Sequence, residues 1–164
     1  MSQGAFWREE IWHPLTVHFP IALLLFATII WLTALLLKNK QRHNCEISGS
    51  LLLFAGSLTA WVSIYTGDIA DGAVAQNLCD PTILKSHEIA SYTMAYLFTA
   101  ASLLNLILIL VKLRDQYVRI LKYGLVLVML FGSGYLTYGA HLGATLVYQQ
   151  GAGVHKPSAD CSGF

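Results

Sequence analysis

Six histidines are the side chains of this sequence best suited to bind a metal or a metal-containing cofactor. They are His13, His18, His43, His87, His141 and His155. Imidazole nitrogen is a common ligand for haem iron, copper and zinc. A single histidine rarely forms such a site, so the chemistry depends on which of the six can meet. Which histidines can meet depends in turn on the secondary-structure elements that carry them.

The composition predicts that these elements are membrane helices. Of the 164 residues, 55% are hydrophobic and 12% are charged, whereas roughly 25% of the residues in ordinary soluble domains are charged. Four long apolar runs predict helices at about residues 15–37, 47–65, 89–111 and 120–147. Each run approaches or exceeds the roughly 20 residues that a helix needs to cross the hydrocarbon core. We therefore expect an all-α fold, with four transmembrane helices bundled in a single domain over residues 1–164.

The distribution of basic residues predicts the orientation of the bundle. Seven flank one end of the predicted helices (Lys38, Lys40, Arg42, Lys112, Arg114, Arg119 and Lys122) and three flank the other (Arg8, Lys85 and Lys156). The positive-inside rule places the more basic end in the cytoplasm. Both termini are then periplasmic in a multi-pass protein of the bacterial inner membrane. The first helix lacks the features of a cleavable signal peptide, so we expect it to be retained.

The spacing of the histidines from the inner lysines gives their depth, because a helix rises about 1.5 Å per residue. His18 lies 20 residues before Lys38, and His141 lies 19 residues after Lys122. These two histidines therefore share one level on different helices, as the axial ligands of a haem iron must. We expect His18 and His141 to be the ligands of a b-type haem iron.

A second level, nearer the outer surface, contains His13 and His87. Each lies 25 residues before an inner lysine, Lys38 or Lys112. These histidines could ligate the iron of a second haem, hold a smaller metal ion, or contact the propionates of the first haem. The alternative for each is a structural role, and His13-Pro14 is typical of a helix start with proline in the first turn. We expect His155, in a glycine-rich segment, to be structural.

Two further groups outside the helices could do chemistry. Cys79 and Cys161 both fall on the predicted periplasmic side, where they could form a disulfide or remain two free thiols. Asp68 and Asp71 could relay protons or bind a cation, but the Asp-Gly pair of residues 66–72 mainly predicts a turn. The sequence contains no Cys-x-x-Cys-His motif, so we do not expect a covalently attached c-type haem.

Three segments of the chain resemble a known family. They are His-Pro-Leu-Thr-Val-His-Phe-Pro-Ile-Ala at residues 13–22, Ser-His-Glu at 86–88, and Gly-Ala-His-Leu-Gly at 139–143. They are similar to the prokaryotic four-helix membrane family called domain of unknown function 2231, and the first segment is the most specific. The resemblance implies four membrane helices and an association with redox chemistry, because family members occur near or fused to cytochrome c modules. It implies no settled activity.

These observations predict a membrane-bound b-type cytochrome-like electron-transfer protein, or a subunit of a larger redox complex, with one haem b or two. The expected partners are membrane lipids together with a quinone, a periplasmic cytochrome c or a larger redox complex. A formal net charge of +1 gives no field that would attract nucleic acid. The alternative is a non-redox membrane module that binds a small metal or scaffolds a partner complex.

Overall fold

The computed structural model describes residues 8–154. Four long helices account for nearly all of this range: α1 (Glu9–Leu36), α2 (Asn39–Val74), α3 (Pro81–Leu110) and α4 (Asp115–Gln150). A short 3-10 helix, η2 (Ala75–Asn77), follows α2. All four long helices have the length and apolar composition needed to cross a membrane. The prediction of an all-α, multi-pass membrane fold is therefore confirmed.

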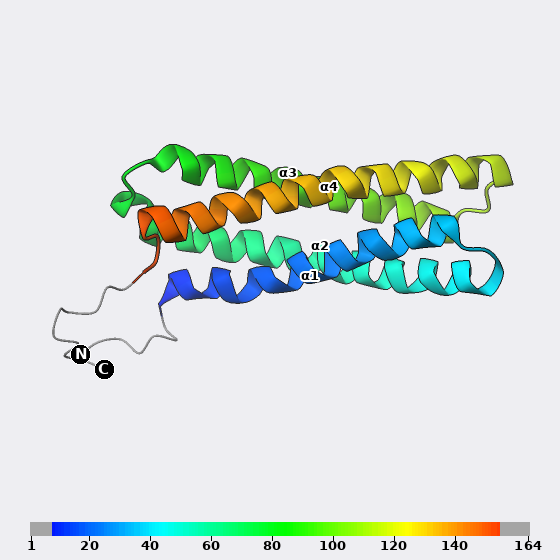
Figure 1. Ribbon diagram of the computed structural model, residues 1–164, viewed down its shortest axis with the longest axis horizontal. Helices are drawn as coiled ribbons and strands as arrows, with labels where there is room; N and C mark the ends of the chain where they lie inside the picture. Colours follow the sequence, from blue (N-terminus) through cyan, green and yellow to red (C-terminus); the bar gives the residue numbers. More distant parts are fainter. Residues whose placement is uncertain (1–7, 155–164) are drawn as a thin grey trace.

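The four helices form two antiparallel hairpins that lie side by side (Figure 1). α1 packs closely on α2, and α3 packs closely on α4, whereas the contacts between the two hairpins are much less extensive. Only Leu37 and Lys38 separate α1 from α2. The start of α1, the end of α4 and the connection between α2 and α3 consequently lie at one end of the bundle (Figure 1).

Glycines bring the helices close together in the core. A Cβ added at Gly56 would lie 2.6 Å from Leu24, and one added at Gly132 would lie 2.8 Å from the ring of Phe98. Both Leu24 and Phe98 are fully buried. Small residues at such positions allow membrane helices to approach and to gain van der Waals contact. Hydroxyl pairs, such as Ser57 with Ser102 at 2.9 Å, also link neighbouring helices.

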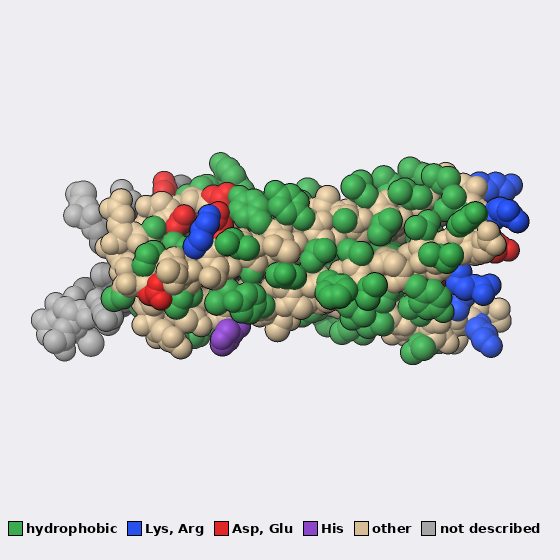
Figure 2. Space-filling model, turned by 90° about the horizontal axis from the view of Figure 1, so that it is seen from above, with side chains coloured by type: hydrophobic (Ala, Val, Ile, Leu, Met, Phe, Trp, Pro, Cys, Tyr) green, Lys and Arg blue, Asp and Glu red, His purple; other side chains and the backbone are tan. Residues whose placement is uncertain are grey.

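The outer surface divides into an apolar waist and two charged ends. Figure 2 shows Lys and Arg gathered at the end that carries the short loops, and most of the visible Asp and Glu at the opposite end. Large apolar side chains are exposed between them, including those of Phe26, Leu58 and Phe131. Exposure of this kind is expected for side chains that face lipid.

Helix α2 differs most from its predicted bounds, because it continues to Val74. The turn predicted at residues 66–72 is therefore wrong. Ala70 is buried in this last part of α2, and tertiary packing of one face overrides the local preference of an Asp-Gly pair. The chain turns later, at residues 78–80, where Asp80 caps α3 by accepting a hydrogen bond from the Thr82 backbone N–H.

Helix α1 also begins earlier than predicted, at Glu9. Pro14 and Pro20 therefore lie inside α1 and not in its first turn. Each proline leaves one backbone carbonyl of the preceding turn without its helical hydrogen bond. Membrane helices tolerate this where neighbouring helices or hydroxyl groups surround the freed backbone.

Candidate cofactor site

A pocket of about 380 Å³ opens between the two hairpins, at the end of the bundle that carries the connection from α2 to α3. All four long helices contribute to its wall, which is largely apolar and includes Val17, Ile64, Met94 and Leu136. Pockets that bind cofactors and small molecules commonly have volumes of about 300–1,000 Å³ and apolar walls with a few polar groups. This pocket has both properties.

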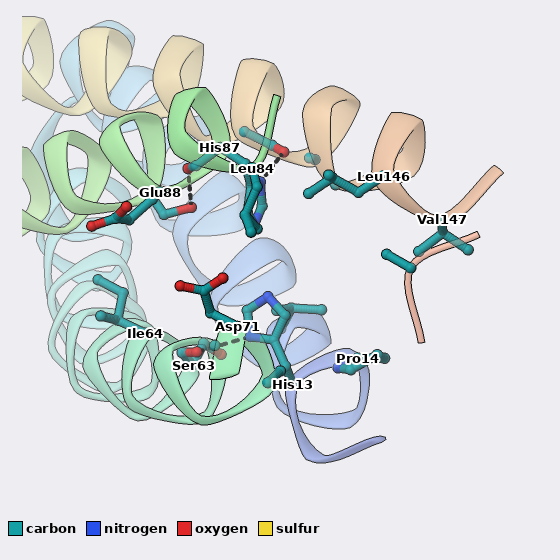
Figure 3. A pocket seen from close by; sticks show the side chains of 18 of the residues that line it. His13, Pro14, Ser63, Ile64, Asp71, Leu84, His87, Glu88, Leu146 and Val147 are labelled. Carbon is teal, nitrogen blue, oxygen red and sulfur yellow. Dashed lines mark hydrogen bonds between the residues drawn. The ribbon is translucent and has the colours of Figure 1, made fainter. Parts of the chain in front are cut away.

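His13 of α1 and His87 of α3 approach each other across the pocket (Figure 3). Their ring centroids are 6.0 Å apart, and the ring planes meet at 79°. The two rings come from different hairpins and from sequence positions 74 residues apart. The structure thus places His13 and His87 at one level of the bundle, whereas their role in binding a cofactor remains a prediction.

Each imidazole is oriented by a backbone carbonyl from the other helix of its own hairpin. Nδ1 of His13 lies 2.9 Å from the carbonyl oxygen of Ser63 in α2. Nδ1 of His87 lies 2.9 Å from the carbonyl oxygen of Gly139 in α4. A carbonyl oxygen only accepts, so Nδ1–H must be the donor in both bonds. The Nε2 nitrogen of each neutral ring then keeps its lone pair for a metal, as in most metal-ligating histidines.

A glycine makes room for each ring. A Cβ added at Gly67 in α2 would lie 3.1 Å from Cε1 of His13, and a Cβ added at Gly143 in α4 would lie 3.3 Å from Cε1 of His87. Any larger residue at either position would therefore press on the imidazole. The two histidines are thus held by matched surroundings in the two hairpins.

Four carboxylates also line the pocket: Glu10, Asp68, Asp71 and Glu88. Three of them have polar partners. Glu10 accepts a hydrogen bond from Arg8, Asp68 accepts one from the hydroxyl of Tyr92, and Glu88 accepts one from Lys85. Asp71 differs, since its Oδ1 atom is buried and makes no hydrogen bond within residues 8–154. Figure 3 shows the Asp71 carboxylate in the space between the hairpins, beside His13.

His18 and His141 lie elsewhere in the bundle. Both side chains are exposed, and neither lines the pocket. The structure therefore brings together the outer pair, His13 and His87, and the axial role of His18 and His141 remains a prediction. His43 is exposed near the start of α2, and His155 lies outside the described residues.

The proposed disulfide also remains a prediction. Cys79 is exposed, and Cys161 lies outside the described residues. Among the residues that the structure describes, no group of three or more His, Cys, Asp or Glu side chains is arranged to hold a metal ion.

Four residues that orient the histidines were not predicted as site residues. They are Ser63 and Gly139, which act through their backbone carbonyls, and the glycines at positions 67 and 143. A sequence signal for them does exist, because Ser63 and Gly67, like Gly139 and Gly143, are small residues spaced by four on the helix that pairs with the histidine. Such a spacing presents one helix face.

Comparison with known proteins gives one match. Residues 11–156 match a family model described as "Predicted membrane protein (DUF2231)". This range covers most of the chain and agrees with the resemblance seen in the sequence. No curated protein and no solved structure matches the chain.

Proposed function

We propose that this chain, which belongs to the DUF2231 family of predicted membrane proteins, is a b-type cytochrome-like electron-transfer protein or a subunit of a larger redox complex. The observation that carries the proposal is the pair of imidazoles, His13 and His87, which meet edge-on in the pocket with ring centroids 6.0 Å apart. In this proposal these two histidines would hold the iron of one haem b. The proposal moves this role from His18 and His141, whose side chains are exposed and lie outside the pocket, to the outer pair.

The spacing of the two rings suits a shared metal atom. A ligating imidazole nitrogen lies about 2 Å from its metal and the ring centre about 1 Å farther, so two opposed imidazoles have centres roughly 6 Å apart. Haem iron needs only two protein ligands, because the macrocycle supplies the other four nitrogens. The angle of 79° between the rings is no obstacle, because bonds from two imidazole nitrogens to one metal impose no particular angle between the two ring planes.

The remaining residues of the pocket orient and isolate the two ligands. The carbonyl oxygens of Ser63 and Gly139 accept from Nδ1–H, which fixes the tautomer and makes Nε2 more basic. The apolar wall excludes water and thereby influences the reduction potential. When bound, the haem itself supplies one-electron redox chemistry.

The setting of this proposal is the bacterial inner membrane, with the pocket end on the periplasmic side. Its support is the excess of basic residues at the opposite end. At this depth the electron partner is a periplasmic cytochrome c, a quinone in the outer leaflet or a neighbouring subunit of a redox complex.

The decisive test is the absorption spectrum of the protein purified from haem-supplemented cells, both oxidised and dithionite-reduced. We expect a Soret band that is lost in His13→Ala and in His87→Ala. His18→Ala and His141→Ala are matched controls, because they remove histidines from the same bundle outside the pocket, and both should keep the band. Circular dichroism and a monodisperse gel-filtration peak establish that each variant is folded.

Two results would overturn the proposal. Wild-type protein without a Soret band, despite an ample haem supply, would exclude haem altogether. Loss of the Soret band in His18→Ala and His141→Ala would contradict the proposal if His13→Ala and His87→Ala kept the band. The axial role would then belong to His18 and His141.

The second candidate is a non-redox module that holds a small metal ion between the same two histidines. It is favoured by the Oδ1 atom of Asp71, which lines the pocket wall and has no hydrogen-bond partner among residues 8–154. Imidazole suits copper and zinc, and nearby carboxylates offset the charge of a divalent ion. Stoichiometric copper or zinc in metal analysis, without a Soret band, would select this candidate.

A further inference from the structure

A second hollow, of about 430 Å³, lies at the opposite end of the bundle. It forms where the end of α1 and the start of α2 meet the first turns of α4. Its wall includes three basic side chains, from Arg42, Arg119 and Lys122, together with Glu46 and Asp115. We call it the basic groove.

Two of its charged groups neutralise each other. Lys122 of α4 forms an ion pair with Glu46 of α2, and both side chains are mostly buried. This pair ties the two hairpins together at the basic groove. Its charges are therefore not available to a ligand, and the groups that remain are two arginines and Asp115.

Both arginines have guanidinium N–H groups to spare. Nε of Arg42 donates to the carbonyl oxygens of Leu37 at 2.9 Å and Ala34 at 3.2 Å, which holds the side chain over the end of α1. Its Nη1 makes no hydrogen bond in the described part of the chain. Arg119 is exposed and has no hydrogen bond or ion pair to any residue within 8–154.

We propose that the basic groove binds the phosphate of an anionic phospholipid, with Arg42 and Arg119 as its donors. Guanidinium groups bind phosphate oxygens through paired hydrogen bonds. Seven basic and two acidic side chains flank this end of the bundle, an excess of five positive charges. Basic pockets between membrane helices at such an end attract anionic lipid head groups.

Apolar surface beside the groove argues for a lipid over a free phosphate. Leu35, Val118 and Tyr123 line the groove itself. Ile120 and Leu127 are exposed on the adjoining turns of α4, where they can contact acyl chains. A phosphate held between the arginines would therefore have lipid tails beside a surface that suits them.

The experiment measures lipid binding to the full chain in neutral detergent by native mass spectrometry and by the shift in thermal unfolding. We expect phosphatidylglycerol to bind and to raise the unfolding temperature, and phosphatidylcholine to do neither at the same concentration. Arg119→Gln should weaken phosphatidylglycerol binding about tenfold. Asp115→Asn should strengthen it, because it removes the carboxylate of the groove that makes no ion pair among residues 8–154.

The matched control is Arg114→Gln, which removes the same charge from the same end of the bundle but outside the groove. Equal weakening by Arg114→Gln and Arg119→Gln would show attraction by overall charge alone and would overturn the proposal. Equal stabilisation by inorganic phosphate or glycerol phosphate would identify a free-phosphate site and would also overturn it. Neither outcome depends on whether haem binds at the other end.

Discussion

Ser63 in α2 and Gly139 in α4 occupy equivalent positions in the two hairpins. Each offers its backbone carbonyl to Nδ1 of a histidine on the preceding helix. Each is followed four residues later by the glycine against which the ring of that histidine packs. The pocket is therefore built from two similar halves, although the sequence shows no obvious repeat.

The hydroxyl groups that follow the histidines extend this similarity. Thr16 Oγ1 donates to the carbonyl oxygen of His13 at 3.1 Å, and Ser91 Oγ donates to that of His87 at 2.8 Å. Each hydroxyl lies about one helical turn after its histidine. Two halves that hold their imidazoles in the same way are well suited to a ligand that needs the same group on both of its sides.

We predict that Gly67→Ala and Gly143→Ala will each weaken haem binding about tenfold or more, because disturbing the groups that orient a ligating histidine typically costs 10–100-fold in affinity. The new methyl group would lie 3.1 Å from the ring of His13 in the first variant and 3.3 Å from the ring of His87 in the second. Haem titration followed at the Soret band measures the affinity.

Gly72→Ala in α2 and Gly134→Ala in α4 are the matched controls for these variants. A Cβ at either position would meet nothing within 4 Å among the described residues. If the controls weaken haem binding as much as the pocket variants do, the contact between glycine and imidazole has no part in the effect.

Asp71→Asn distinguishes the two candidate cofactors. With haem bound, loss of the carboxylate removes a negative charge that favours the oxidised iron, so the midpoint potential should rise by a few tens of millivolts, where 59 mV corresponds to a tenfold change for one electron. With copper or zinc bound, the same substitution should lower metal affinity about tenfold. Potentiometric titration and metal analysis measure the two quantities.

We predict that Gly132→Ala will destabilise the bundle by roughly 1–3 kcal/mol, the usual cost of an overpacked core. Its methyl group would lie 2.8 Å from Cε2 of Phe98, which is fully buried and has little space to move. The measurement is thermal unfolding in detergent. Gly124→Ala, also in α4 but without a neighbour within 4 Å in the described chain, should be neutral or slightly stabilising.

The cap of α3 should make its stability depend on pH. Hydrogen bonds from the Thr82 hydroxyl and backbone N–H hold the pKa of the Asp80 carboxyl below its ordinary value of 3.8. Because the pKa is lowered by folding, the stabilisation is fully present above that ordinary value and is lost as the pH falls through the lower, folded value.

Asp80→Asn tests this dependence, since the amide cannot titrate. The difference in unfolding temperature between wild type and variant should be constant near neutral pH and should shrink as the solution is acidified below the ordinary pKa of the carboxyl. A difference that stays constant throughout acidification would show that the carboxylate form contributes nothing to the cap.

Sequence alone predicted the four-helix bundle, and it singled out His13 and His87, whose role as ligands stays a prediction. The four apolar runs and the depth count for His13 and His87 depend on helix length and rise, which are regular properties of any helix. The ends of the helices were less predictable. Helix α2 continues beyond Tyr65, where Ala70 is buried and Gly67 packs on His13 of α1, and such tertiary contacts cannot be read from the local sequence.

The direction in which each histidine side chain points could not be predicted from the sequence either. His18 and His141 satisfy the depth condition as well as the outer pair does, but their side chains are exposed. The depth of a residue follows from counting residues, whereas the direction of its side chain depends on how the helix is rotated against its neighbours. Helix α1 has too little hydrophobic periodicity to reveal that rotation. The role of the Ser63 and Gly139 carbonyls could not be predicted either, because every residue has a backbone carbonyl whatever its type.

The contact between the two hairpins is sparse, and each imidazole is hydrogen-bonded through Nδ1 inside its own hairpin. The bond to Ser63 or Gly139 therefore limits the rotation of each ring without any contact from the other hairpin. A ligand that binds between the hairpins therefore meets two imidazoles that are already oriented, and binding has to fix only the distance between the two hairpins. Little side-chain entropy remains to be lost at that moment.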